Sequence, residues 1–468
     1  MYPSATSFIP LQVALARFFE QTGLVAAGIN YPYWYLGSTP FRWLTGPVVP
    51  GLLAAGRHVF PQAGWYDLFW VLAVVTWLAG GAGMWFLARK LSGGDGGLAV
   101  LFWLAGPLVL LIFPFSDGVR LIGFAWLPWV LVSCLRFWEK GELVDGVTVG
   151  ALSAGLLLTE ALLLPQLVMA VVALAVGKYG WNGAGRRIKK SGLLLVLGVL
   201  TASIWYGAGF WWQLLGSPSF GGLPLYRVAG QLAKLLPVAL AMGLALIAGK
   251  GIRARSSLAR FAFYWTFVFA FLTVMRFLAD PDYWLDWSGY GVELQLGVSL
   301  LLAVWVEKKT AKAQIMYACI YMLIFAYISW SYLIPSFQRD LSDTVEFRIS
   351  RELSKLVRPG ESVFLSGTTA FWLNANCDLV QFRGGRDQAA RLKGWDELAW
   401  EIRESTDTEM AVAKLAEEGI DWLVVHGEES SEYWHDFRKP DRFEGVSGLV
   451  KAYDREGDRI YMVKQSGS

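Results

Sequence analysis

The sequence has little of what soluble enzymes and disulfide-rich domains depend on. Only 17% of its 468 residues are charged, against about 25% in a typical soluble domain. Of its three cysteines, Cys134 and Cys319 lie in apolar runs, which leaves no internal disulfide framework. Its three histidines lack the spacing of a zinc site. The absence of any block of like charges argues against a nucleic-acid-binding protein.

The few charges are unevenly distributed along the chain. Residues 338–468 contain 25 acidic and 18 basic side chains, whereas residues 1–337 contain 13 acidic and 23 basic ones. We therefore predict a basic, apolar membrane body, followed by an acidic and water-soluble domain over residues 338–468.

Apolar runs of the length that a helix needs to cross a membrane, about 20 residues, recur through residues 67–337. We predict about ten transmembrane helices, at 67–88, 97–115, 119–138, 146–159, 161–177, 191–211, 229–248, 258–278, 289–306 and 313–335. Sixteen Lys and Arg residues then lie on one side of the membrane, against Arg120, Arg227 and Arg276 on the other. The basic side is therefore the cytoplasmic one, which makes residues 1–66 and 338–468 extracytoplasmic at the cell (plasma) membrane.

The run over 146–177 is predicted to break in two. As a single helix it would be about 48 Å long, too long for a simple crossing. Pro165 disfavours a continuous helix, and a break at Thr159 and Glu160 keeps the basic loop 178–190 cytoplasmic. Glu160 is then expected at the outer membrane face, where a carboxylate needs a partner or a proton.

Residues 1–66 form the first extracytoplasmic segment of this topology. They contain no signal peptide and no span, so we expect either N-out insertion or a first transmembrane helix upstream of Met1. Residues 8–24 have the pattern of an amphipathic helix lying in the membrane interface. An aromatic strip follows, in which Tyr33 and Trp34 suit either the headgroup layer or stacking on a sugar.

Residues 338–468 are predicted to form a small α/β domain. Helices are expected over 344–357, 394–404 and 407–418, and strands over 362–365, 379–382, 422–425, 450–453 and 460–463. Arg383-Gly384-Gly385-Arg386-Asp387 is its one candidate site, because the glycines permit close approach and the arginines offer anion contacts. The equal alternative is a structural turn. His426 and His435 are expected to lack a nucleophile partner.

Several of these segments resemble a known family. They are the strip Pro32-Tyr-Trp-Tyr-Leu-Gly-Ser-Thr-Pro-Phe41, the hinge Leu158-Thr159-Glu160, and Val380-Gln-Phe-Arg-Gly-Gly-Arg-Asp-Gln-Ala389. The last is similar to the QxRGGxDQ signature of the polytopic membrane proteins called 6-pyruvoyl-tetrahydropterin synthase-related, whose layout is similar to GT-C-type glycosyltransferases.

The resemblance implies an enzyme that takes a sugar from a polyprenyl-phosphate carrier on the outer membrane face. Such enzymes carry an acid in the first outer loop, as catalytic base or as ligand of a divalent metal such as Mg or Mn. Here Glu20 is the only acid before Asp67, a departure that leaves the enzyme prediction open. No pterin, zinc or nucleotide site is indicated.

The candidate catalytic acids are thus Glu20, Glu160 and Glu293, the last two within reach of the bilayer. The candidate substrate-binding residues are those suited to phosphate or sugar: Tyr33, Trp34, Arg120, Arg227, Arg276, Arg383, Arg386 and Asp387. Expected partners are membrane lipids, a polyprenyl-phosphate-linked sugar and a glycan or protein acceptor.

The alternative is a non-catalytic envelope protein that binds or presents a lipid-linked glycan. A transporter is the weaker hypothesis, since no internal repeat of broken spans is evident.

Overall fold

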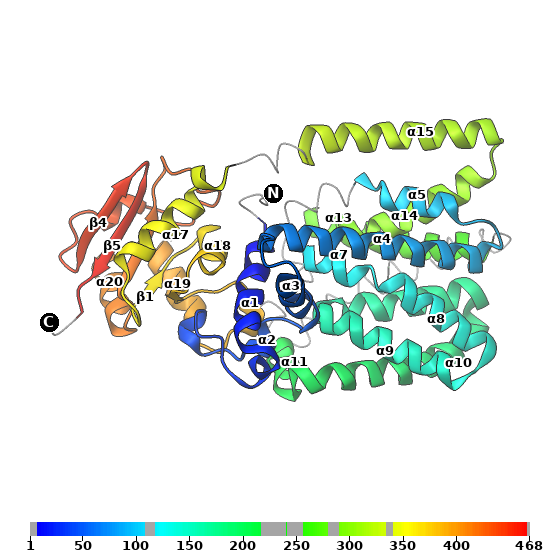
Figure 1. The fold of residues 1–468 in the computed structure, drawn as a ribbon, viewed down its shortest axis with the longest axis horizontal. Helices are drawn as coiled ribbons and strands as arrows, with labels where there is room; N and C mark the ends of the chain where they lie inside the picture. Colours follow the sequence, from blue (N-terminus) through cyan, green and yellow to red (C-terminus); the bar gives the residue numbers. More distant parts are fainter. Residues whose placement is uncertain are drawn as a thin grey trace.

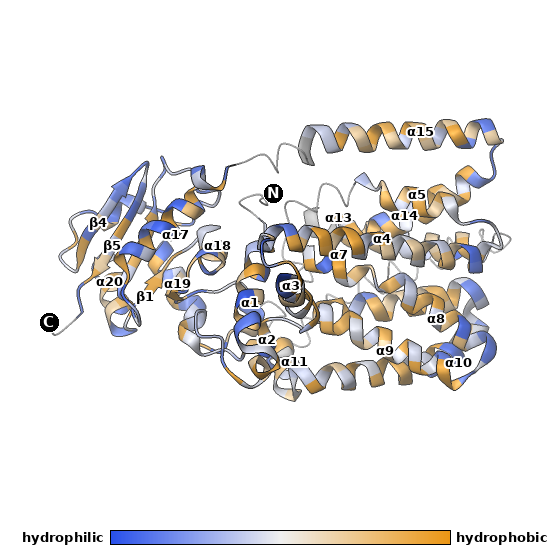
Figure 2. Ribbon diagram, in the orientation of Figure 1, coloured by the Kyte–Doolittle hydropathy of each residue, from blue (hydrophilic) through white to orange (hydrophobic). Residues whose placement is uncertain are grey.

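The computed structural model describes residues 7–107, 118–216, 240, 256–278, 290–333 and 340–465. A bundle of helices forms one end of the molecule, and a sheet with its covering helices forms the other (Figure 1). Helix α1 (Ile9–Thr22) lies between these two parts. The apolar residues concentrate on the bundle, and hydrophilic residues gather in the sheet part and at the far end of the bundle (Figure 2).

The bundle is built from apolar helices of very different lengths. Among the described residues, five candidate spans meet the length and composition of a membrane crossing: Trp65–Ser92, Gly118–Lys140, Ala161–Tyr206, Ser257–Val274 and Ala311–Ser331. Leu143–Thr159 is a shorter apolar helix. The predicted span 229–248 lies outside the described residues except for residue 240, so the number of about ten crossings stays a prediction.

The helices of this part overlap the predicted spans where they are described, with two differences. The predicted span 119–138 is divided into two helices, and helix runs through residues 178–190 on both sides of a kink at Gly180, where a loop was expected. In chain order they are α2 (Phe41–Leu44), α3 (Val48–Val59), α4 (Trp65–Ser92), α5 (Gly97–Leu104), α7 (Gly118–Phe124), α8 (Leu127–Lys140), α9 (Leu143–Thr159), α10 (Leu164–Tyr206), α11 (Ala208–Gly216), α13 (Ser257–Leu278), α14 (Gly291–Glu307) and α15 (Ala311–Ile328).

The predicted break in 146–177 is confirmed. Helix α9 ends at Thr159, and Glu160 caps the short 3-10 turn Ala161–Leu163 by accepting a hydrogen bond from the Leu162 amide at 3.3 Å. Pro165 then stands in the first turn of α10, a position that needs no amide donor.

Helix α10 is interrupted at Gly180, whose φ of 67° and ψ of 175° are not helical. Leu162 before the helix and Tyr206 at its end line the same cavity. The two halves of α10 therefore run in opposite directions about Gly180. This places the basic residues 178–190 at the end of the bundle away from that cavity.

The C-terminal part contains a five-stranded mixed sheet of order β2-β1-β3-β5-β4. Its strands are β1 (Ser362–Phe364), β2 (Val380–Gln381), β3 (Trp422–His426), β4 (Leu449–Arg455) and β5 (Asp458–Val463). Strand β1 is parallel to β2 and β3, and β5 is antiparallel to β3 and β4. The helices are α17 (Val345–Leu356), α18 (Thr369–Asn376), α19 (Trp395–Glu404) and α20 (Thr408–Glu417). The strands and helices predicted here are confirmed to within two residues.

The helix expected over 8–24 forms as α1, and protein covers much of its surface. Its expected place in the membrane interface stays a prediction. Its residues are buried nearly all round, because α3 and α4 pack on one side and α18 on the other. Arg17 on its polar side donates to the Asn374 carbonyl at 2.9 Å and pairs with Asp378 at 3.1 Å. The C-terminal part thus covers the polar side of α1, which the sequence pattern predicts to face water and lipid headgroups.

Candidate functional site

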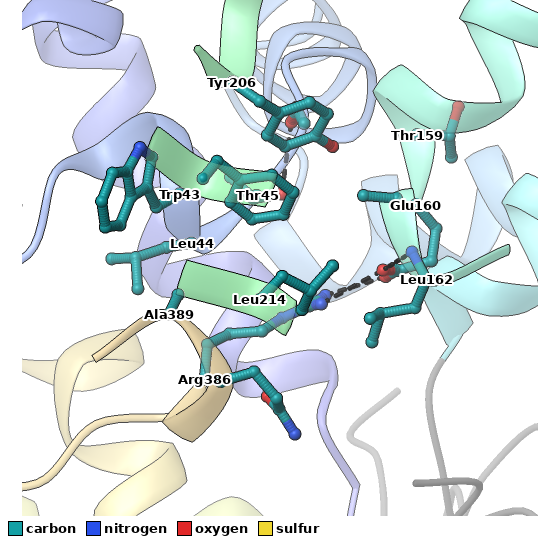
Figure 3. A pocket seen from close by; sticks show the side chains of 14 residues that line it. Trp43, Leu44, Thr45, Thr159, Glu160, Leu162, Tyr206, Leu214, Arg386 and Ala389 are labelled. Atoms are coloured by element: carbon teal, nitrogen blue, oxygen red, sulfur yellow. Dashed lines mark hydrogen bonds and ion pairs between the residues drawn. The ribbon is translucent and has the colours of Figure 1, made fainter. Parts of the chain in front are cut away.

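A small cavity lies where the hinge after α9, the end of α10 and the C-terminal part meet (Figure 3). Its volume of about 20 Å³ is room for roughly one water molecule. Its lining mixes aromatic, apolar and polar side chains: Trp43, Leu44, Thr45, Thr159, Glu160, Leu162, Tyr206, Phe210, Leu214, Arg386, Gln388 and Ala389.

A bidentate ion pair between Arg386 and Glu160 dominates this cavity. The guanidinium Nη2 lies 2.9 Å from Glu160 Oε2, and Nη1 lies 3.2 Å from Oε1. Glu160 is 5% exposed and Arg386 is 16% exposed. Two candidate residues that are distant in the sequence are therefore brought together, one from the membrane hinge and one from the C-terminal loop. A planar guanidinium with two parallel contacts to an oxyanion has the geometry that also binds a phosphate.

The two glycines of the Arg383–Asp387 loop let it approach the N-terminal segment. A Cβ on Gly384 would lie 2.7 Å from Trp34 Cβ, and one on Gly385 would lie 2.0 Å from Leu11 Cδ2. The glycines therefore allow the loop to pack closely against Trp34 and Leu11 of the N-terminal segment. This packing holds the loop in a position from which Arg386 reaches Glu160.

The other two candidates of this loop have protein partners. Asp387 accepts a hydrogen bond from the Tyr35 hydroxyl at 2.8 Å, which fixes the loop against the aromatic strip. Arg383 donates to Ser366 at 3.0 Å and lies 3.5 Å from Asp436. Asp387 therefore ties the loop to the N-terminal segment and Arg383 ties it to the C-terminal part, while Arg386 alone of the three lines the cavity.

The aromatic strip packs inside the protein. Trp34 is fully buried and donates from Nε1 to Asn374 Oδ1 at 2.9 Å. Tyr33 is partly buried, and its carbonyl accepts from the Gln381 amide at 2.8 Å. Neither side chain lines the cavity. The expected headgroup belt or sugar platform is therefore a docking surface for the C-terminal part in this structure.

Glu293 and Arg120 form a second buried ion pair. Glu293 in α14 is fully buried and pairs with Arg120 in α7. The Gln166 side-chain oxygen, in its preferred orientation, accepts from Arg120 Nη2 at 2.9 Å. Neither charged residue lines the cavity around Glu160. The pair links separate helices of the bundle.

The remaining candidates lie elsewhere. Glu20 is exposed on α1 and does not line the cavity. Arg227 lies outside the described residues, and Arg276 is described only as part of the backbone of α13.

The described residues do not form a site for the divalent metal that the family resemblance implies. Among them, no three His, Cys, Asp or Glu side chains gather as metal ligands would. The carboxylate of Glu160 is bound by the guanidinium of Arg386.

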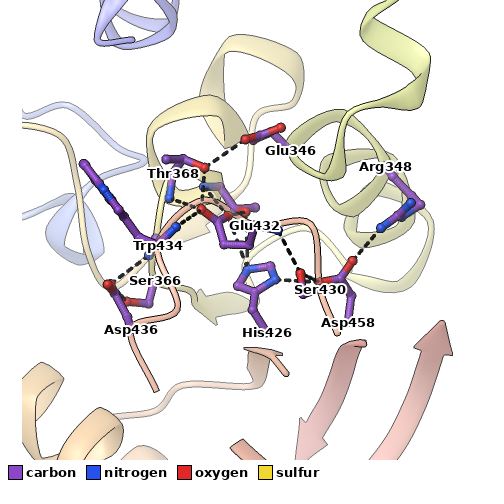
Figure 4. A network of polar contacts seen from close by, with 12 residues as sticks. Glu346, Arg348, Ser366, Thr368, His426, Ser430, Glu432, Trp434, Asp436 and Asp458 are labelled. Carbon is purple, nitrogen blue, oxygen red and sulfur yellow. Dashed lines mark hydrogen bonds and ion pairs between the residues drawn. The ribbon is translucent and has the colours of Figure 1, made fainter. Parts of the chain in front are cut away.

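A buried polar network crosses the C-terminal part (Figure 4). His426 Nδ1 lies 2.8 Å from Asp458 Oδ1, and its Nε2 lies 3.3 Å from Thr369 Oγ1. Glu432 accepts from the Thr368 amide at 2.8 Å, and Glu346 accepts from the Thr368 hydroxyl at 2.8 Å. His426 is the last residue of β3, and its pairing with Asp458 was not predicted from the sequence. Its members come from separated segments, so no spacing in the sequence signals it.

Burial and charge shift the pKa values in this network. Burial lowers the pKa of His426, but its hydrogen bond with Asp458 and the charge of Glu432 outweigh burial and raise it above 6.5. Burial raises the pKa of Asp458, yet the contacts with His426 lower it below 3.8. Burial and the charge of Glu432 raise the pKa of Glu346.

The signs give a pH window for stability. The stabilisation from His426 is complete below pH 6.5 and is lost as the pH rises through its raised pKa. That from Asp458 is complete above pH 3.8 and is lost as the pH falls through its lowered pKa. The raised pKa of Glu346 also makes the folded state less stable as the pH rises, as the raised pKa of His426 does. The network is therefore most stable at mildly acidic pH.

Sequence reasoning missed several residues that line the cavity. Trp43 and Thr45 come from the N-terminal segment, Tyr206 ends α10, and Gln388 follows Asp387. The Tyr206 hydroxyl donates to the Leu157 carbonyl at 2.9 Å, which ties the end of α10 to the end of α9. Gln388 belongs to the segment that carries the family resemblance, although it was not chosen as a site residue. Trp43, Thr45 and Tyr206 have no unusual residue type or spacing, so only the packing of α9, α10 and the loop identifies them.

The structure is similar to solved membrane transferases. It matches the arabinofuranosyltransferase AftD from Mycobacteria with a TM-score of 0.57 and 15% identity, over 100% of this chain and 40% of AftD. ArnT from Cupriavidus metallidurans matches with a TM-score of 0.49 and 16% identity, over 97% of this chain and 93% of ArnT. The oligosaccharyltransferase of Archaeoglobus fulgidus matches with a TM-score of 0.49 and 13% identity, over 100% of this chain and 72% of that enzyme.

The likeness to AftD supports the GT-C-like fold, and at 15% identity it is a likeness of fold alone. The chain spans less than half the length of AftD. No family model and no curated protein matches the sequence. The resemblance to the 6-pyruvoyl-tetrahydropterin synthase-related proteins therefore stays a prediction.

Proposed function

We propose that this chain is an integral membrane glycosyltransferase of the GT-C type, which transfers a sugar from a polyprenyl-phosphate donor at the outer face of the cell membrane. The observation that carries the proposal is the bidentate pair between Arg386 and Glu160 in a cavity at the end of the membrane helices. The pair holds a carboxylate and a cation of phosphate-binding geometry side by side, and the proposed topology puts both near the lipid phosphates.

Arg386 is assigned to the leaving group. The phosphate of the donor carries two oxygens that fit the guanidinium fork as the carboxylate of Glu160 does. When the phosphate takes that place, the negative charge that develops on it as the bond to the sugar breaks is balanced by Arg386.

Glu160 is assigned the role of general base. Once released from Arg386, its carboxylate accepts the proton of the acceptor hydroxyl. The acceptor oxygen bonds to the anomeric carbon, the bond from that carbon to the phosphate oxygen breaks, and the polyprenyl phosphate leaves with the electron pair.

Admission of the substrates requires the lining elements to separate. The cavity holds roughly one water molecule at its volume of about 20 Å³, which is far less than a sugar needs. The C-terminal loop and the hinge of the membrane body are joined across it by the ion pair. Opening therefore means that the C-terminal part moves away from the hinge.

A turnover assay in detergent tests the proposal. Release of polyprenyl phosphate from a panel of polyprenyl-phosphate sugars is measured for the wild type, Glu160→Gln and Arg386→Gln. Removal of a general base or of a charge-stabilising group is expected to lower turnover by about 100-fold or more. The matched control for Arg386 is Arg351→Gln, an exposed arginine on α17, which should leave turnover unchanged.

Glu20→Gln separates the two sequence-based assignments of the base. If it abolishes release while Glu160→Gln does not, the base lies on α1 and the assignment of Glu160 is wrong.

The closed state of the cavity favours one alternative, a non-catalytic protein that binds or presents a lipid-linked glycan. In that case Glu160 and Arg386 serve only to hold the C-terminal part in place. Binding of a lipid-linked sugar without release of lipid phosphate for any donor would support this alternative.

The side of the membrane is tested separately. Glu409 is exposed on α20, so Glu409→Cys gives a thiol on the C-terminal part. An impermeant maleimide should label it in intact cells, with the wild type as control. Labelling only after the cells are opened would place the C-terminal part in the cytoplasm and contradict the proposed topology.

A further inference from the structure

A second cavity lies at the opposite end of the bundle, at the point where α10 is interrupted. It has a volume of about 380 Å³ and is lined by residues of α10 and of the first turns of α13: Val176, Lys178, Tyr179, Gly180, Trp181, Asn182, Arg260 and Tyr264. It is large enough for a small headgroup, unlike the cavity around Glu160.

The two helices that form this cavity carry positive charge and no negative charge. Helix α10 contains five Lys or Arg residues and no Asp or Glu, and α13 contains no Asp or Glu and contributes Arg260 to the lining. In the part of the chain that the structure describes, Glu139 is an acid that reaches the lining, where it pairs with Lys178; it also pairs with Lys90. The cavity is therefore basic in balance.

The charges are arranged around an aromatic ring. The Arg187 guanidinium lies 3.5 Å from the centroid of the Tyr179 ring, and Lys178 Nζ lies 5.6 Å from it. Arg260 Nε donates to the Gly177 carbonyl at 2.6 Å, which fixes that guanidinium at the rim. Trp181 is 50% exposed at the mouth, a position typical of an aromatic residue at the membrane–water interface.

The surface next to this basic segment is apolar. The second half of α10 exposes a run of large apolar side chains: Leu193, Val196, Leu197, Leu200 and Ile204. Acyl chains fit such a surface, whereas a soluble anion would not use it. A headgroup in the cavity and chains along the helix together describe a phospholipid.

We infer that this cavity binds the headgroup of an anionic glycerophospholipid on the membrane face opposite to the C-terminal part. Arg187 is not itself a lining residue, but its guanidinium packs on the ring of Tyr179, which is one. The phosphodiester lies on this side of the cavity, beside Lys178 and within the field of Arg187, and the acyl chains lie along α10. Basic pockets between transmembrane helices select anionic over zwitterionic lipids, because each nearby Lys or Arg adds to the attraction. The inference does not depend on the proposed transferase activity.

Native mass spectrometry of the full-length protein in detergent tests this inference. Phosphatidylglycerol and phosphatidylcholine with identical acyl chains are titrated, and free glycerol phosphate is added as competitor. The wild type should bind phosphatidylglycerol at least about tenfold more tightly than phosphatidylcholine. The double variant Lys178→Gln/Arg187→Gln should bind it about 25-fold more weakly, at about fivefold per charge.

Two further variants make the result specific. Lys308→Gln/Lys309→Gln removes two charges from the turn after α14, outside the cavity, and should bind like the wild type. Lys178→Arg/Arg187→Lys keeps both charges and should retain binding within about threefold, which controls for damage to the fold.

Three outcomes would overturn the inference. They are equal binding of the two lipids, unchanged binding by the Lys178→Gln/Arg187→Gln protein, and full competition by glycerol phosphate at equal concentration. The last outcome would make the cavity a site for soluble anions.

Discussion

The Arg386–Glu160 pair predicts strong energetic coupling between the C-terminal part and the membrane hinge. The two side chains are 16% and 5% exposed and share two contacts of 3.2 and 2.9 Å. Removal of one partner leaves the other charge buried, which costs about 3–5 kcal/mol in such pairs. Glu160→Gln and Arg386→Gln should each lower the free energy of unfolding by an amount in this range.

The double variant should lose clearly less than the sum of the two single variants, because no buried charge is left alone. We expect a coupling energy of about 2 kcal/mol or more. Equilibrium unfolding of the detergent-solubilised protein in denaturant, followed by tryptophan fluorescence, measures the three variants against the wild type.

The matched control is the pair between Lys414 and Glu401, which joins α20 to α19. These side chains are 39% and 19% exposed, so we expect a coupling of only about 0–1 kcal/mol. A coupling for Arg386 and Glu160 that is no larger than this control would refute the reasoning. The pair would then be a surface contact, and the closed cavity would not be held by it.

Three further predictions concern stability and packing. Because the pKa of His426 is raised, thermal unfolding midpoints should fall from pH 6 to pH 8 in the wild type and change little in His426→Gln; parallel curves would contradict the assignment. Gly384→Ala places a Cβ 2.7 Å from Trp34 Cβ and should cost about 1–3 kcal/mol of unfolding free energy and reduce turnover. Gly28→Ala meets open space and should stay within about 0.5 kcal/mol in the same denaturant titration. Glu293→Ala removes the partner of Arg120 and should cost about 3–5 kcal/mol; a loss of turnover at unchanged stability would instead place Glu293 in the catalytic machinery.

Part of the candidate site was predictable from the local sequence. Glu160 is an acid between two apolar runs, and Arg386 is an arginine that follows two glycines. Both patterns are unusual, and each residue was chosen as a candidate for that reason. The pairing of the two was not predictable, because 226 positions separate them and no local rule relates them. Arg120 was assigned to substrate binding as an arginine on the predicted outer side, but in the structure it pairs with Glu293.

The aromatic strip shows why composition misleads at a surface that another part of the chain covers. Tyr, Trp, Pro and Gly in succession are typical of a membrane interface or a sugar platform. The indole of Trp34 donates a hydrogen bond to Asn374, and the hydroxyl of Tyr35 donates one to Asp387. Both partners come from the C-terminal part, whose position no pattern within the strip reveals.

The sequence by itself determined the division between apolar helices and an acidic α/β part, the break at Glu160, and the position of the strands. These follow from the length, period and polarity of short segments, which act over a few neighbouring residues. Only the tertiary structure decided that α1 is sandwiched, that the reversal predicted over 178–190 is made at Gly180 within α10, and that Arg386 closes on Glu160. Such contacts depend on which surfaces meet when distant segments pack, and charge and shape on both surfaces enter that choice together.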